Sequence, residues 1–200
     1  MGMNAINYDK RMLETLETAQ GKRLLLHSCC APCSTACLEE VSAKMKTCVF
    51  YYNPNLDGEE EYEKRKREQI RLLRETGCAD YFDCGYDHDE FLRAVCGLET
   101  EKEGGARCEK CFRLRLARTA SEAKARGFDY FATTLTLSPL KNARLINEIG
   151  LMLQEEYGVL YLPTDFKKRG GYLRSIELSK QYHLYRQNYC GCEFSKKSPD

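Results

Sequence analysis

The chain has 200 residues, of which 42% are hydrophobic and 30% charged, and its 31 basic residues nearly balance 30 acidic ones. This length and composition predict one globular domain with a buried core, and they exclude a disordered chain and a membrane-spanning one. The N-terminal residues also lack the apolar stretch of a signal peptide, so a cytoplasmic protein with no membrane partner is expected.

Short β-rich segments alternate with helical patterns along the chain. Strands are predicted at residues 23–27, 47–52, 81–83, 128–134 and 159–162. Helices are predicted at residues 33–44, 59–75, 89–95, 107–126, 141–156 and 173–184. Gly77, Gly127 and Gly158 stand where helices should stop and strands begin. The alternation predicts an α/β fold in which a mostly parallel sheet is covered by helices on both faces.

No repeat, low-complexity tract or flexible linker divides the sequence, so residues 1–200 are expected to form a single domain. Residues 1–21 predict an amphipathic helical extension, and residues 181–200 predict a functional C-terminal tail. Cysteines follow the first predicted strand, residues 133–139 follow the fourth, and Asp165 follows the fifth. The carboxyl ends of parallel strands meet at one edge of a sheet, where ligands collect, so these residues are expected to converge.

Twelve cysteines in a reducing compartment favour metal or redox chemistry over a disulfide framework. Three groups stand out: Cys29-Cys30-Ala31-Pro32-Cys33, Cys108-x-x-Cys111 and Cys190-Gly191-Cys192. The second group opens a predicted helix with both sulfurs on one face, where free N–H groups and the helix dipole stabilise thiolates. The third group has one intervening glycine, which permits a strained and easily reduced disulfide.

The first two groups supply four thiolates from Cys29, Cys30, Cys108 and Cys111, enough for a zinc site or a [4Fe–4S] cluster. Zinc cannot change its redox state, whereas a dithiol beside an iron–sulfur centre makes an electron-transfer unit, so the third group favours iron and sulfur. Cys33 is either a further ligand or only the first residue of its helix. The remaining cysteines are interpreted as small buried hydrophobic residues: Cys37, Cys48, Cys78, Cys84 and Cys96.

Two segments carry local positive charge although the whole chain is nearly neutral. Residues 107–126 hold seven basic groups against two acidic ones, and residues 164–197 hold eight against three. Such an excess is typical of a nucleic-acid contact face, and it also occurs on ordinary solvated helices. Charge alone leaves both interpretations open.

From about Leu24 to Ser195 the sequence resembles the QueH epoxyqueuosine reductases, iron–sulfur enzymes of tRNA modification. The resemblance rests on several long motifs in the same order: LLLHSCCAPCS (24–34), FYYNPN (50–55), EGGARCEKCFRLRLARTA (103–120), FDYFATTLTLSPLKN (128–142), TDFKKRGGY (164–172) and LYRQNYCGCEFS (184–195). The N-terminal extension before Lys22 matches weakly, and Cys84 and Cys96 lie outside the motifs. The resemblance implies a HUP-type, Rossmann-like α/β domain.

The resemblance also implies a cobalamin-independent oxidoreductase that reduces the epoxide of epoxyqueuosine, at the tRNA wobble position, to queuosine. It carries the [4Fe–4S] ligands onto Cys29, Cys30, Cys108 and Cys111. It assigns the redox-active disulfide to Cys190 and Cys192. An additional iron ion is left open, for which Cys33 and Asp165 are the candidate ligands. The implied partners are a queuosine-type tRNA, bound at its anticodon loop, and an external electron-donor protein.

The acid that protonates the leaving oxygen is not fixed by the sequence, and Asp165, Tyr172 and Tyr189 are the candidates. Two other classes of protein compete with the reductase. A tRNA sulfur-transfer or adenylating enzyme should carry a glycine-rich phosphate loop after the first strand, where this chain has HSCCAPCS. A zinc-stabilised RNA-binding domain would have no need of the third cysteine group.

Overall fold

A fully parallel sheet forms the centre of the molecule in the computed structural model, which describes residues 6–195. Its five strands lie in the order β3-β2-β1-β4-β5. Their bounds are Arg23–Ser28 for β1, Lys46–Tyr51 for β2, Asp80–Asp83 for β3, Tyr130–Thr133 for β4 and Leu160–Tyr161 for β5. Each coincides with a predicted strand to within two residues, so the predicted α/β alternation is confirmed.

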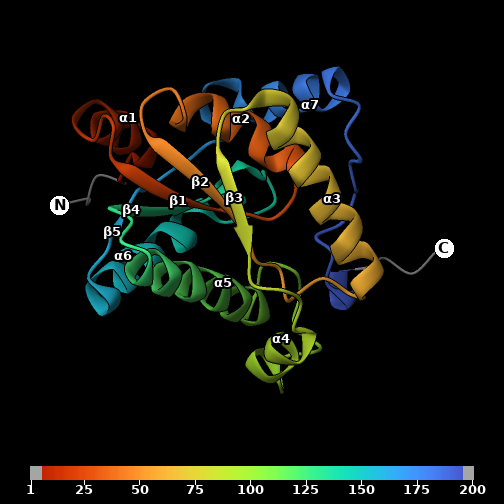
Figure 1. Cartoon of the computed structure of the whole chain (residues 1–200). Coiled ribbons are helices and arrows are strands. Elements are labelled where there is room, and N and C mark those ends of the chain that lie inside the picture. Colours follow the sequence, from red (N-terminus) through yellow and green to blue (C-terminus); the bar gives the residue numbers. More distant parts are fainter. Residues whose placement is uncertain (1–5, 196–200) are drawn as a thin grey trace.

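Helices cover both faces of this sheet (Figure 1). One layer contains α1 (Tyr8–Thr18), α2 (Ala31–Val41), α3 (Glu59–Thr76) and α7 (Gly171–Gln181). The other contains α5 (Ala106–Ala125) and α6 (Ala143–Tyr157), while α4 (His88–Val95) packs beside α5 and away from the sheet. Short 3₁₀ turns occur at Thr134–Leu137 (η1), Lys168–Gly170 (η2) and Glu193–Ser195 (η3). Within residues 6–195, no helix has the length and apolar character needed to cross a bilayer.

The central strand β1 shows why the core forms on both faces. Leu24 and Leu26 point into the layer of α1, α2 and α7, and Leu25 points into the layer of α5 and α6. All three side chains are fully buried. A strand that is covered on both faces needs apolar residues at every position rather than at alternate ones. Each of these side chains stabilises the fold by about 1.5–3 kcal/mol relative to an exposed one.

The predicted N-terminal helix is present as α1 and is part of the core. Asn7 caps it, because its side-chain oxygen accepts a hydrogen bond of 3.0 Å from the backbone N–H of Lys10. Tyr8, Met12 and Leu16 then follow at helical spacing and are buried. Residues 1–5 of the predicted extension lie outside the described residues.

The segment after α7 lies along α3 as an irregular strap (Figure 1). The backbone N–H of Tyr185 donates to the Glu68 carboxylate at 2.8 Å, and the backbone N–H of Asp57 donates to the Gly191 carbonyl at 2.9 Å. Leu184 packs against the start of α2. The tail is therefore fixed to the body of the domain as far as Ser195. The basic residues Lys196 and Lys197 lie outside the described residues.

Candidate metal and redox site

The site lies between β1 and β4, where the connections that leave the strands change from one face of the sheet to the other. β1 and β4 are neighbours, but the chain passes from β1 to α2 on one face and from β4 to α6 on the other. Such a switch point opens a crevice at the carboxyl ends of the two strands. Cys29 directly follows β1, and its backbone N–H donates to the Thr134 hydroxyl, directly after β4, at 3.4 Å. The predicted meeting of residues at this edge is confirmed for these two strands.

The three cysteines of the first group are gathered at this edge. The sulfurs of Cys29, Cys30 and Cys33 all lie within 4.8 Å of one another, and those of Cys29 and Cys30 are 3.9 Å apart. Cys30 is the extended N-cap of α2, and Pro32 lies in the first turn, where its missing N–H costs no hydrogen bond. Hydrogen bonds from Cys30 and Cys33 lower the pKa of the Cys29 thiol. This set of donors suits a thiophilic metal.

A buried polar network holds the loop that carries these cysteines. The hydroxyls of Ser28 and Ser34 both donate to the side-chain oxygen of Gln69 on α3, at 2.7 and 2.9 Å. The side-chain amide of Asn53 donates to the Ser28 carbonyl at 2.9 Å. His27 is buried between Thr133 and Tyr52 and bonds to both, so it is part of this network.

The second and third cysteine groups lie at the start of α5 and in the strap. Cys111 is buried and packs against Cys192 in a small cluster that includes Phe91. The Cys108 sulfur accepts a hydrogen bond of 3.2 Å from the backbone N–H of Gly104. The twelve cysteines all lie within the described residues, and none of them is in a disulfide in the structure.

A cavity of about 880 Å³ brings the first group and the strap together. Three types of side chain matter most in its lining. Four carry a thiol: Cys29, Cys30, Cys33 and Cys190. Four are cationic: Arg65, Arg115, Lys141 and Arg186. The apolar and aromatic side chains at its rim include Leu140, Tyr172 and Tyr189. The described residues that line this cavity do not include Cys108, Cys111, Cys192 or Asp165.

The cavity lining carries four cationic side chains against one carboxylate, that of Glu103. Arg65 and Arg115 are almost fully buried, and each has a terminal nitrogen, Nη2, without a hydrogen-bond partner among the described residues. Burial lowers the pKa of Lys141, but the nearby Cys190, Cys29 and Cys33 outweigh this effect and raise it. Thiol ligands beside buried cations with free N–H groups fit an anionic metal–thiolate group such as an iron–sulfur cluster.

The basic segments singled out in the sequence are largely used within the protein. In residues 107–126, Arg107 and Arg115 are buried, and the exposed arginines pair with neighbouring glutamates. Arg169 pairs with Asp9 and Glu40. The four cations that line the cavity are therefore a better-defined site for an anion than the excess of basic residues in the two sequence segments.

Several cysteine and acid predictions can be compared with the structure. Burial is confirmed for Cys37 and Cys48, but the prediction is wrong for Cys84 and Cys96, which are exposed at the surface where their elements end. Asp165 forms an ion pair with Lys167, at 3.5 Å, outside the cavity lining.

The sequence analysis did not single out Arg65 and Gln69, although their positions on α3 indicate that they are buried. Both lie on the stripe of α3 that also buries Tyr62 and Leu72, so they are polar residues at core positions of an amphipathic helix. Arg115 was counted only as one charge of a basic run, although it lies one turn after Cys111. Lys141 was expected to begin a helix, whereas α6 begins at Ala143.

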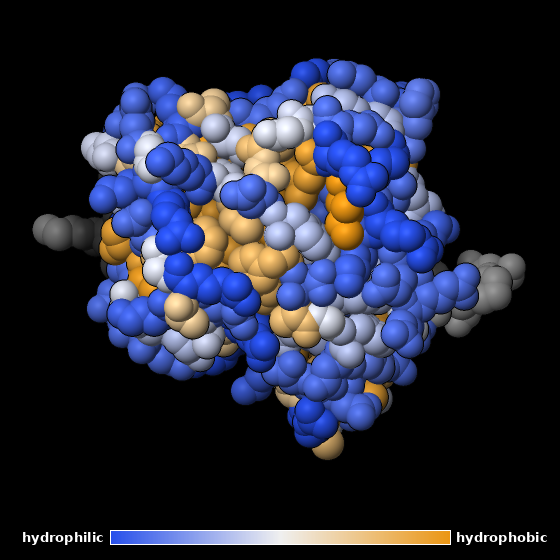
Figure 2. Space-filling model, viewed as in Figure 1, coloured by the Kyte–Doolittle hydropathy of each residue, from blue (hydrophilic) through white to orange (hydrophobic). Residues whose placement is uncertain are grey.

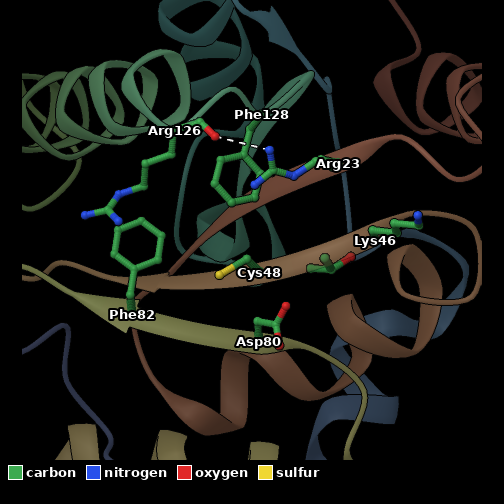
Figure 3. A pocket seen from close by; sticks show the side chains of 8 residues that line it. Arg23, Lys46, Cys48, Asp80, Phe82, Arg126 and Phe128 are labelled. Carbon is green, nitrogen blue, oxygen red and sulfur yellow. Dashed lines mark hydrogen bonds between the residues drawn. The ribbon is translucent and has the colours of Figure 1, made fainter.

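A second, smaller cavity of about 480 Å³ lies at the opposite, amino end of the sheet. Figure 2 shows hydrophobic residues gathered in a hollow on the face that exposes the β3 edge. In Figure 3 the Arg126 guanidinium lies over the Phe82 ring, 4.1 Å from its centre, and Arg23 donates to the Arg126 carbonyl. Both arginines are already partnered, since Arg126 also pairs with Glu122. The lining of this hollow contains one thiol, that of Cys48, and so no cluster of thiols like that of the larger cavity.

Comparisons with known proteins match one family over most of the chain. A sequence model of "Epoxyqueuosine reductase QueH" matches residues 24–198. A QueH of Staphylococcus epidermidis is 42% identical over 95% of this chain and 84% of its own length. A QueH of Streptococcus pyogenes serotype M1 is 41% identical over 96% of this chain and 79% of its own length.

One solved structure shares the fold at low sequence identity. The U34-tRNA thiolase NcsA from Methanococcus maripaludis, solved with its [4Fe-4S] cluster, aligns with a TM-score of 0.57 and 12% identity, covering 95% of this chain and 67% of its own. This likeness concerns the architecture. The family match over most of the chain and the identities above 40% concern the activity. The chain therefore belongs to the epoxyqueuosine reductase QueH family, and its activity is that of an oxidoreductase acting on epoxyqueuosine.

Proposed function

We propose that the chain reduces epoxyqueuosine at the wobble position of tRNA to queuosine, with a [4Fe–4S] cluster held in the cysteine-lined cavity. The observation that carries this proposal is the meeting of three clustered thiols, a fourth thiol and four cations in one cavity of about 880 Å³. The reaction opens the epoxide C–O bonds, consumes two electrons and two protons, and yields an alkene and water. A bound cluster would supply single electrons and a Lewis-acidic iron.

The proposed cluster ligands are Cys29 and Cys30, which line the cavity, and Cys108 and Cys111, which lie at the start of α5 outside its lining. Cys33 adds a thiol within 4.8 Å of the first two, which supports it as a ligand of the same cluster or of an additional iron ion. The start of α5 carries the other pair, and its N–H groups favour anionic sulfur. Asp165, paired with Lys167 outside the cavity lining, has weaker support as a metal ligand.

Cys190 and Cys192 are proposed to store the two electrons that the reaction consumes. Cys190 lines the cavity beside the first cysteine group, and Cys192 packs behind it against Cys111. Oxidation of the two thiols to a disulfide releases two electrons and two protons, which matches the stoichiometry of the reduction. An external donor protein would then return the pair to the dithiol state, as expected in the cytoplasm.

The rim of the cavity is suited to a nucleoside. Tyr172 and Tyr189 place phenol groups at the cavity, which supports either one as the proton donor for the epoxide oxygen. Arg186 lies over the Tyr172 ring, 5.5 Å from its centre, and Leu140 is 77% exposed beside them. An unpaired anticodon base can stack on such a surface while Lys141 and Arg186 attract phosphates.

The test is an anaerobic reaction of the iron-loaded protein with epoxyqueuosine-containing tRNA and dithionite, followed by nucleoside mass analysis. Queuosine should form with the wild-type chain and should form more slowly with Cys190→Ser, whose cluster absorbance should be intact. A cluster-loaded protein that forms no queuosine would overturn the proposal. A thiolated nucleoside would favour sulfur transfer, and a colourless protein with stoichiometric zinc would favour a structural metal site.

A further inference from the structure

Arg115 is a buried cation without a carboxylate. Its side chain is 1% exposed, in the first half of α5 and one turn after Cys111. Its Nε donates to the Cys111 carbonyl at 3.4 Å, and Nη2 has no partner. Among residues 6–195, no aspartate or glutamate forms an ion pair with it, whereas Arg65 has the Glu61 carboxylate at 2.7 Å.

A buried guanidinium with no anion is strongly unfavourable, because its lost hydration is not replaced. Arg115 shares its cavity with four cysteine sulfurs and one carboxylate, that of Glu103, with which it forms no ion pair among the described residues. It lines the cavity together with Cys29 and Cys190.

We propose that Arg115 is the internal counter-cation of the iron–sulfur group, a positioning residue shared by the cysteine groups of residues 29–33 and 190–192. The inference rests on the proposed function, because it requires an anionic group in the cavity. One electron added to the cluster breaks no bond and increases the negative charge of the site by one. A fixed cation at the cavity wall therefore favours the reduced state and raises the reduction potential.

The chain offers a matched set of variants. Arg115→Met removes the charge and keeps most of the side-chain volume, and Arg115→Lys keeps the charge. Arg118→Met is the control, since Arg118 lies on the same helix but is half-exposed, pairs with Glu122 and does not line the cavity. Reconstituted proteins are titrated with dithionite under a controlled potential, and the cluster absorbance reports the fraction reduced.

Arg115→Met should shift the one-electron equilibrium at least tenfold toward the oxidised cluster, a potential about 59 mV lower. Arg115→Lys should recover most of that shift, and Arg118→Met should show none. An Arg115→Met protein that carries a full cluster at the wild-type potential would refute the role. Equal shifts in the two methionine variants would also refute it, because they would show only a general charge effect.

Thermal unfolding separates charge balance from simple packing. Without metal, Arg115→Met should be at least as stable as the wild-type chain, because an unbalanced buried charge has been removed. With the cluster bound, the variant should gain less in Tm than the wild type does. A loss of stability that is equal with and without metal would assign Arg115 to packing alone. If the wild-type chain takes up no cluster, the proposed cofactor fails, and the same comparison with Zn²⁺ tests Arg115 independently.

Discussion

The side-chain oxygen of Gln69 accepts a hydrogen bond of 2.7 Å from the hydroxyl of Ser28, the residue immediately before Cys29. The same oxygen accepts a second bond from Ser34, the residue immediately after Cys33. One buried amide on α3 thus holds both ends of the loop that carries the first cysteine group. The shape of this loop depends on a residue more than thirty positions away in the sequence.

Gln69→Leu should loosen this loop. The substitution leaves two buried hydroxyls with fewer partners, so the free energy of unfolding should fall by about 1–3 kcal/mol. Iron content after reconstitution, measured per folded chain, should fall as well. Ser34→Ala should show the same direction of change. Ser42→Ala is the control, because the buried Ser42 hydroxyl has no hydrogen-bond partner among the described residues. If Ser42→Ala lowers the iron content as much as Gln69→Leu does, Gln69 has no specific role in metal binding.

Cys33→Ser tests the third thiol of the first cysteine group, Cys29, Cys30 and Cys33, which follows β1. If Cys33 is a ligand, the variant should bind less iron than the wild-type chain and show a changed cluster absorbance, as Cys29→Ser and Cys30→Ser should. Cys84→Ser is the control, since Cys84 is exposed and lies outside the site. Iron content and spectrum identical to those of Cys84→Ser would restrict Cys33 to packing.

Gly191→Ala should disturb the dithiol without disturbing the cluster. Gly191 has φ +108°, and a Cβ there would contact Leu56 and lie 2.9 Å from Nη1 of Arg65, so the strap would have to shift. Turnover with tRNA should fall about tenfold or more, while iron content stays unchanged. Gly21→Ala is the matched control, because its φ is +75° but no atom lies within 4 Å of the added carbon. Similar turnover in both variants would show that the position of the strap is unimportant.

His27 predicts a pH dependence of stability in the metal-free protein. Its pKa is lowered to about 3 in the fold, first by burial and then by Arg115. At pH values between about 3 and about 6.5, the unfolded chain carries a proton on His27 that the folded chain lacks. The free energy of unfolding therefore falls as the pH falls through this range. The wild-type chain should lose about 2 kcal/mol relative to His27→Gln between pH 6.5 and 4.5 in urea unfolding. Parallel curves would show that His27 is protonated in the fold.

Tyr172→Ala should weaken recognition of tRNA. Loss of one stacking surface costs about 1–3 kcal/mol, so the KM for tRNA should rise roughly tenfold. If Tyr172 only stacks, kcat should change less than KM; a large fall in kcat that Tyr172→Phe reproduces would make Tyr172 the proton donor instead. Leu140→Ala should act in the same direction. Leu173→Ala is the control, because Leu173 is 64% exposed beside Tyr172 but does not line the cavity. An unchanged KM in Tyr172→Ala would place the anticodon elsewhere.

The strands were predictable because each is a short apolar run that ends in a polar or glycine-containing turn, and β1 is the clearest example. The position of Cys29 at the cavity followed from its place directly after that strand. The roles of Gln69 and Arg115 could not be predicted in the same way. Their partners are set by tertiary packing between α3, α5 and β1, and sequence spacing within one helix does not report it. The strap was predictable as a functional segment, but its attachment to α3 was not.

The cavity is closed by segments from nearly opposite ends of the sequence, which has a consequence during synthesis. Roughly 160 residues separate Cys33 from Cys190, and at about 5–20 residues per second the ribosome needs roughly 10–30 s to make them. During that time the nascent chain presents the thiols of the first group without the strap that later covers them. Reducing conditions at the ribosome are therefore needed to keep these thiols free until the strap is made.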